Sequence, residues 1–279
     1  MSGSYHVPCR ERSADTAVTI VPGTNHGKML ESSVLAALGE ELPVKRRTAS
    51  PSLLHALRAA LARVAEPARA EAMQAYMKSA MPYHGVSAAN VRTVCREVFT
   101  DYTFETAEAW RADVLALWRN ADFREERYAA IALSGHRGAK AFQTLEALPM
   151  YEEMIVNGAW WDYVDVLAAR RIGVLLASYP REMRRVVLSW SHAADLWKRR
   201  SAILAQLSFG EGTDLTLLFA CIEPSLAEKD VFLRKAIGWS LRQAARHYER
   251  DIVRYVRDYD ARLSPLAKRE ALKHVKTTP

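Results

Sequence analysis

The chain has little cysteine, glycine or proline, and each shortage excludes a class of protein. Three cysteines, Cys9, Cys95 and Cys221, make an odd count without a close pair, so the sequence indicates neither a disulfide framework nor a thiolate metal site. Glycine and proline number only 12 and 11 in 279 residues, while 49% of the residues are hydrophobic, which excludes a disordered chain. This composition is typical of a globular protein with a sizeable core.

Long hydrophobic runs are also missing. No apolar run approaches the roughly 20 residues that a membrane-spanning helix needs. The apolar stretch at residues 18–21 follows Glu11 and Asp15 and is too short for the hydrophobic part of a secretory signal. We therefore expect a cytoplasmic monomer without a membrane partner, whose cysteines stay reduced.

Motifs for the common cofactors are absent as well. The chain has no P-loop, no convincing dinucleotide fingerprint and no His-Glu-x-x-His zinc motif, and its eight histidines are scattered. We expect neither a metal nor an organic cofactor. A helix-hairpin-helix followed by a catalytic lysine is not found either, which disfavours a bifunctional lyase.

The sequence does have a one-sided excess of basic residues. Residues 1–180 carry 20 Lys and Arg against 20 Asp and Glu, whereas residues 181–279 carry 19 against 12. Such an excess at one end of the chain favours a polyanionic partner. The plainer interpretation is a solvated helical surface.

Helical spacing of apolar residues dominates the chain from residue 52 onward. Turn signals such as Met81-Pro82, Pro149 and Pro180 divide this part into about a dozen predicted helices, and alternating β-branched runs are absent. Residues 1–50 lack sustained periodicity and hold one plausible short helix, over residues 32–42. The sequence therefore predicts a flexible extension, 1–50, and a single all-α domain, 51–279.

A weak internal repeat is centred on isoleucines. Ile131, Ile203 and Ile237 each follow a basic residue and an alanine, and they are separated by 72 and 34 residues. A period of roughly 36 residues is expected of stacked helix pairs. The repeat between Ile131 and Ile203 should therefore be centred near Leu167.

This register predicts a shared face. At about 100° per residue, Trp161, Asp165, Arg200 and Trp239 project roughly 60° to 200° away from the core residue of their own repeat. Equivalent helices of a solenoid line one surface, so these four side chains should face a common groove. Trp161 and Asp165 lie one helical turn apart, which puts an aromatic face beside a carboxylate.

Residues 66–276 resemble the AlkD-like DNA alkylation-repair glycosylases, which are built from HEAT-like repeats. The resemblance is carried by Trp160-Trp-Asp-Tyr-Val-Asp165, Leu196-Trp-Lys-Arg-Arg-Ser-Ala-Ile203, Arg234-Lys-Ala-Ile-Gly-Trp-Ser-Leu-Arg242, Leu263-Ser-Pro-Leu-Ala-Lys-Arg-Glu-Ala-Leu-Lys-His274 and the segment Met77 to Arg92. It implies an all-α, right-handed superhelical solenoid of HEAT-like antiparallel helix pairs with a concave basic face.

The resemblance also implies a monofunctional N-glycosylase that removes cationic N3- or N7-alkylated purines from double-stranded DNA in an open cleft. Asp165, Trp161 and Trp239 match the active-cleft residues, and Arg200 matches a basic residue that contacts the DNA backbone. The remaining residues that we expect to contact DNA are Tyr76, Arg92, Lys198, Arg199 and Arg242. The N-terminal extension departs from the family pattern.

The expected chemistry needs few groups, because an alkylated purine already carries the positive charge that weakens its glycosidic bond. A carboxylate about 4 Å from the developing sugar cation stabilises it by about 4 kcal/mol at a dielectric near 20, or roughly a thousandfold in rate. Indole faces add about 0.5 to 2 kcal/mol each. Trp110, Trp118, Trp190 and Trp197 are interpreted as packing residues.

Two alternatives to catalysis stay open on the sequence. Helical repeats are most often binding scaffolds, so the same surface suits a non-enzymatic module that binds DNA or an acidic protein. Asp165 can cap a neighbouring helix, and Arg200 can belong to a solvated charge run with Lys198 and Arg199.

Overall fold

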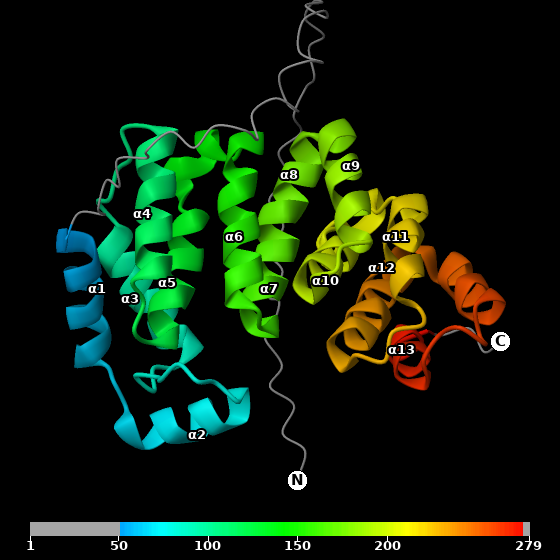
Figure 1. Ribbon diagram of the computed structural model, residues 1–279, viewed down its shortest axis with the longest axis horizontal. Helices are drawn as coiled ribbons and strands as arrows, with labels where there is room; N and C mark the ends of the chain where they lie inside the picture. The colour runs from blue at the N-terminus through cyan, green and yellow to red at the C-terminus, as the bar shows by residue number, and fades with distance from the viewer. Residues whose placement is uncertain (1–50, 276–279) are drawn as a thin grey trace, which may run out of the picture. The chain divides into compact units, whose positions relative to one another are not determined.

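The computed structural model describes residues 51–275, with side chains from Leu53 onward (Figure 1). These residues fall within one compact unit. Residues 1–50, with the short helix expected over 32–42 and Cys9, lie outside the described residues, so the predicted extension stays a prediction.

Every regular element between residues 51 and 275 is helical, which confirms the predicted all-α solenoid of helical repeats. The α-helices are α1 (Pro51–Arg63), α2 (Pro67–Met77), α3 (Ala88–Phe99), α4 (Ala107–Arg119), α5 (Arg124–Ser134), α6 (Leu148–Gly158), α7 (Trp161–Leu167), α8 (Gly173–Ser178), α9 (Pro180–Ser191), α10 (Leu196–Leu204), α11 (Leu215–Ile222), α12 (Val231–Asp258) and α13 (Pro265–Ala271). Short 3-10 turns η1 (Arg137–Phe142), η2 (Leu145–Ala147), η4 (Gly210–Gly212) and η5 (Glu223–Ser225) and the π-helical turn η3 (Ala168–Ile172) connect them.

Local sequence signals explain where many of these helices begin. Side-chain oxygens of Ser87, Thr106, Asp195, Asp214 and Asp230 accept a hydrogen bond from a backbone N–H in the first turn of α3, α4, α10, α11 and α12. Such caps satisfy backbone donors that have no partner within the helix. Prolines occupy the first turn of α2, α6, α9 and α13, where their missing N–H costs nothing.

The helices follow one another across the fold in chain order. In Figure 1, α4, α5, α6 and α7 stand upright side by side, and α2 lies crosswise to them. Two clusters of buried apolar side chains hold this row together: the first extends from α1 to α11, and the second joins Ala168 of η3 to α10, α11, α12 and α13. Helix α2 buries only Met77, so it contributes little to either cluster.

Helix α7, which carries the predicted site, is short and interrupted at both ends. Ala159 takes a left-handed conformation (φ 42°) and reverses the chain after α6. A Cβ on the preceding Gly158 would lie 3.1 Å from the ring of Trp118, so glycine permits this close approach. Beyond Leu167 the π-helical turn replaces regular α-helix, a feature that is frequent at functional sites.

Candidate active site

The repeat register predicted from the isoleucines is confirmed. Ile131, Leu167, Ile203 and Ile237 are at most 5% exposed and lie on α5, α7, α10 and α12. These four helices pack successively, α5 on α7, α7 on α10, and α10 on α12. Leu167 therefore occupies the core position of the missing repeat, and α7 belongs to the same row of helices as its neighbours.

Asp165 and Arg200 meet in a two-pronged ion pair between α7 and α10. Arg200 Nε donates to Asp165 Oδ1 at 2.7 Å, and Nη2 donates to Oδ2 at 2.8 Å. The third nitrogen, Nη1, donates to the carbonyl oxygen of Phe232 at the start of α12. One guanidinium thus joins three consecutive repeats, and its planar fork fixes the orientation of the carboxylate.

The two partners differ in their access to solvent. The Asp165 side chain is 12% exposed, whereas that of Arg200 is 4% exposed and each of its nitrogens donates within the protein. Helical projection placed both in an open groove, but it contains no information on side chains that bond across helices. Contact of Arg200 with the DNA backbone stays a prediction, and within the structure its guanidinium bonds to Asp165 and to Phe232.

The environment of Asp165 perturbs its protonation. Burial raises the pKa of the carboxyl group above its ordinary value of 3.8, and the Arg200 guanidinium opposes this rise. The charge of Asp162, one turn earlier on α7, raises the pKa further. A buried carboxylate persists when it is both paired and hydrogen-bonded, and Arg200 meets both conditions.

The adjacent residues Trp160 and Trp161 have different surroundings. The Trp160 ring lies 5.4 Å from the Phe232 ring and 6.3 Å from the Trp197 ring, centroid to centroid, and packs against the first apolar cluster. Trp161 is half-buried, and within residues 51–275 it neither joins an apolar cluster nor stacks on another ring. Trp160 is therefore the member of this pair that packs with other aromatic rings.

Trp239 is half-buried on α12 and packs at the margin of the second apolar cluster. It follows Phe232, whose carbonyl accepts from Arg200, by seven residues, which is two turns and about 10 Å along the same face of the helix. The structure thus joins Asp165 to Arg200 directly. That both tryptophans face the same groove stays a prediction.

The tryptophans interpreted as packing residues are confirmed in that role. Trp110, Trp118 and Trp190 are at most 4% exposed, and Trp197 packs against the first apolar cluster.

Three of the predicted DNA-contacting cations are paired with carboxylates from other helices or loops. The pairs, each with an N–O distance of 2.5 Å, are Lys198 with Glu152, Arg199 with Glu228 and Arg242 with Glu270. Tyr76 on α2 is 69% exposed, and Arg92 on α3 is exposed. None of these positions tests a DNA contact, so all five stay predictions.

One functional candidate, Asp162, was missed in the sequence. It lies three residues before Asp165 and pairs with Arg124 of α5, whose Nη2 donates to both carboxylate oxygens at 2.7 and 2.8 Å. The signal was present, since residues three apart share a helix face. The sequence did not indicate its partner, because Arg124 lies 38 residues away on another helix.

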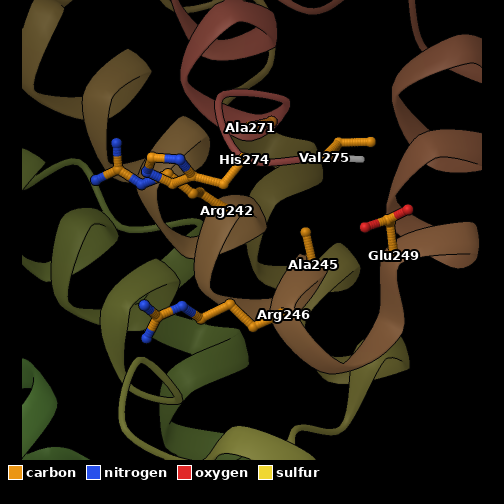
Figure 2. Close-up of a pocket in the computed structure, with 7 residues that line it drawn as sticks. All are labelled: Arg242, Ala245, Arg246, Glu249, Ala271, His274 and Val275. Carbon is orange, nitrogen blue, oxygen red and sulfur yellow. The ribbon is translucent and has the colours of Figure 1, made fainter. Parts of the chain in front are cut away.

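A cavity of about 320 Å³ lies between α12 and α13, away from Asp165. Figure 2 shows Arg242, Arg246 and His274 extending to one side of it and Glu249 standing on the other. Arg242 follows Trp239 by about one helical turn, and of the predicted site residues only Arg242 lines this cavity.

The described part of the chain holds no cluster of three side chains suited to a metal ion. Nor does any of its helices combine the length and the apolar character needed to cross a membrane.

Comparison with known proteins places this geometry in a family. The family model described as DNA alkylation repair enzyme matches residues 57–275. Among solved structures, the chain is similar to a protein described as a predicted DNA alkylation repair enzyme from Enterococcus faecalis, with 27% identity and a TM-score of 0.69 over 77% of this chain and 98% of that one. A comparison with curated proteins finds no match.

Proposed function

Because the chain belongs to the DNA alkylation repair enzyme family, we propose that it is a monofunctional N-glycosylase for N3- and N7-alkylated purines in double-stranded DNA. The observation that carries this proposal is the Asp165 carboxylate, which is oriented by Arg200, is 12% exposed and lies one turn from the half-buried Trp161.

The reaction breaks one bond and forms another without a cofactor. The C1′–N bond of the cationic nucleotide breaks, its electron pair passes to the purine nitrogen, and the base leaves neutral. The positive charge moves to the sugar, where Asp165 stabilises it. Water then bonds to C1′ and loses a proton, with Asp165 as the nearest acceptor, which leaves an abasic site.

Arg200 reduces the electrostatic contribution of Asp165. A carboxylate about 4 Å from the sugar cation contributes about 4 kcal/mol at a dielectric near 20, and a guanidinium about 8 Å away opposes it by about 2 kcal/mol. The pair together therefore stabilises the transition state by about 2 kcal/mol, or roughly thirtyfold in rate. What the enzyme gains from Arg200 is a fixed and ionised carboxylate rather than a larger charge.

Half-buried indoles suit the remaining task, which is to hold a cationic nucleotide. Trp161 and Trp239 would contact it through their ring faces, worth about 0.5 to 2 kcal/mol each. A site that recognises charge should discriminate strongly against neutral lesions. We expect N7-methylguanine to be released and uncharged hypoxanthine and uracil to be retained, as measured by chromatography of the free bases; equal rates would exclude charge stabilisation.

Phosphate contacts would come from the basic residues on the neighbouring helices. Partly exposed ion pairs such as Lys198 with Glu152 contribute only about 0 to 1 kcal/mol to stability, so a phosphate can replace the carboxylate at little cost. Such contacts make DNA affinity fall steeply with salt.

The alternative is a scaffold that binds DNA or an acidic protein without catalysis. The observation that favours it is the same ion pair, because joining α7 to α10 is a sufficient structural reason for a bidentate Asp165. Duplex DNA carrying N7-methylguanine or N3-methyladenine separates the two: an enzyme releases free base and stops doing so in Asp165→Asn while still binding the duplex, whereas a scaffold releases none in either form. A protein-binding scaffold would fail to bind duplex DNA even at low salt.

A further inference from the structure

A second buried ion pair, Arg124 with Asp162, lies beside the candidate active site and takes no part in the proposed reaction. Arg124 Nη2 contacts both oxygens of Asp162, at 2.7 and 2.8 Å, and the two side chains are 6% and 13% exposed. A buried pair of charges seldom stabilises a fold more than apolar residues of the same volume would. Its presence next to the site therefore suggests a task other than stability.

Several other groups hold this pair in place. The Tyr128 hydroxyl donates to Asp162 Oδ2 at 2.5 Å and lies 3.1 Å from the Tyr83 hydroxyl. The Arg124 guanidinium lies 4.2 Å from the centroid of the Tyr163 ring, and its Nη1 is 3.3 Å from Ser79 Oγ. The network reaches from the loop after α2 through α5 to α7, and it fixes the place of the Asp162 carboxylate.

The rotation of helix α7 is set by the packing of its buried side chains Tyr163, Val164 and Leu167 and by the contacts of its two acids. The helix is seven residues long, has no side-chain cap at its start and gives way to a π-helical turn at its end. Its two acids pair with residues of two different helices: Asp162 with Arg124 on the preceding α5, and Asp165 with Arg200 on the following α10. Two bidentate contacts in opposite directions add to this packing and oppose rotation of α7 about its own axis.

We propose that Arg124 and Asp162 are positioning residues, which hold α7 in the rotation that presents Trp161 and Asp165 to the substrate. This inference rests on the proposed glycosylase function. It requires the two-pronged geometry and not merely a positive charge, because a displacement of about 1 Å at a reacting group can cost on the order of a hundredfold in rate.

The first test separates base release from DNA binding. In Asp162→Asn and in Arg124→Lys, which keeps the charge but loses the planar fork, we expect single-turnover release of N7-methylguanine to fall about a hundredfold, while the Kd for the same duplex changes less than threefold. Tyr128→Phe removes one hydrogen bond to Asp162 and keeps the ion pair, so we expect its rate of base release to fall only a few fold. This milder variant tests the positioning role if Asp162→Asn and Arg124→Lys fail to fold.

The matched control is Glu126→Gln. The Glu126 side chain is 0% exposed and pairs with Arg58 of α1 at 3.0 Å, so its ion pair holds α5 to α1 and not to α7. A purely structural role for Asp162 predicts that both variants lose activity in proportion to their loss of melting temperature. Positioning predicts that, at a temperature where both are folded by circular dichroism, only Asp162→Asn loses the rate.

A second measurement does not depend on activity. In protein labelled with 5-fluorotryptophan, the fluorine resonance of Trp161 is assigned as the one that disappears in Trp161→Phe. We expect its chemical shift to change in Asp162→Asn and Arg124→Lys and to stay the same in Glu126→Gln. The resonance of buried Trp110 should stay unchanged in all three variants. A stationary Trp161 resonance, an unchanged rate, or an equal loss in Glu126→Gln would overturn the positioning role. If the unaltered protein releases no base, the proposed function is wrong, and the fluorine spectrum alone decides whether α7 is positioned by this pair.

Discussion

The ion pair of Asp165 with Arg200 makes an unusual prediction: a second substitution should restore part of what the first removes. In Asp165→Asn, the stabilising contribution of about 4 kcal/mol to the sugar cation is lost and the opposing contribution of about 2 kcal/mol from Arg200 remains. The barrier rises by about 4 kcal/mol, which is about a thousandfold in rate. In the double variant Asp165→Asn with Arg200→Met both charges are gone, and the barrier rises by only about 2 kcal/mol, about thirtyfold.

Stability should follow the same order, for a related reason. Asp165→Asn leaves a guanidinium that is 4% exposed without its carboxylate, and an unpaired buried charge costs about 3 to 5 kcal/mol. For a domain of this size the melting temperature should fall on the order of 10 °C. Replacing the partner by apolar methionine removes that cost, so the double variant should melt close to the unaltered protein.

The assay is single-turnover release of N7-methylguanine from duplex DNA with enzyme in excess, alongside thermal melting followed by circular dichroism. Asp251→Asn, which removes the acid from an exposed pair with Arg254, controls for a general change of charge. A double variant no faster than Asp165→Asn would show that Arg200 contributes directly to the transition state or to DNA binding. An undiminished rate in Asp165→Asn would remove the carboxylate from the mechanism.

Three further outcomes follow from the same structure. Burial raises the pKa of Asp165 and the reaction needs its ionised form, so the rate of base release should decline as pH falls, with an apparent pKa above 3.8. A rate that stays constant down to pH 3.8 would contradict the assignment of Asp165. Trp161→Leu should slow base release by roughly two- to thirtyfold with little change in melting temperature, whereas Trp197→Leu should mainly lower the melting temperature. Lys198→Ala and Arg242→Ala should each reduce the slope of log affinity against log salt by about one in a filter-binding titration, and an unchanged slope would remove that residue from the phosphate contacts.

Helical content was predictable because apolar spacing along the chain is a local property. The prediction of an all-α repeat fold needed only the period of the buried residues and the turn signals between them. The position of Leu167 followed from the spacing of Ile131, Ile203 and Ile237, since stacked repeats must bury equivalent residues. The roles of Trp110, Trp118 and Trp190 followed from the same rule.

Helical projection placed Asp165 and Arg200 on one shared surface of neighbouring repeats, but it did not predict that they bond. Whether two side chains meet depends on the separation and rotation of their helices, and that information is absent from the pattern of either helix. The bonds of the Arg200 guanidinium to Asp165 and to the carbonyl of Phe232 were therefore not expected, and its contact with DNA stays a prediction.

The sequence by itself determined the helices and the repeat that stacks them, because these depend on spacing along one chain. Only the tertiary structure decided which cation each acid of α7 takes: Asp162 pairs with Arg124, 38 residues earlier, and Asp165 with Arg200, 35 residues later. The physical reason is that an ion pair requires atoms within about 3 Å, and such distances arise only when helices from different repeats have packed.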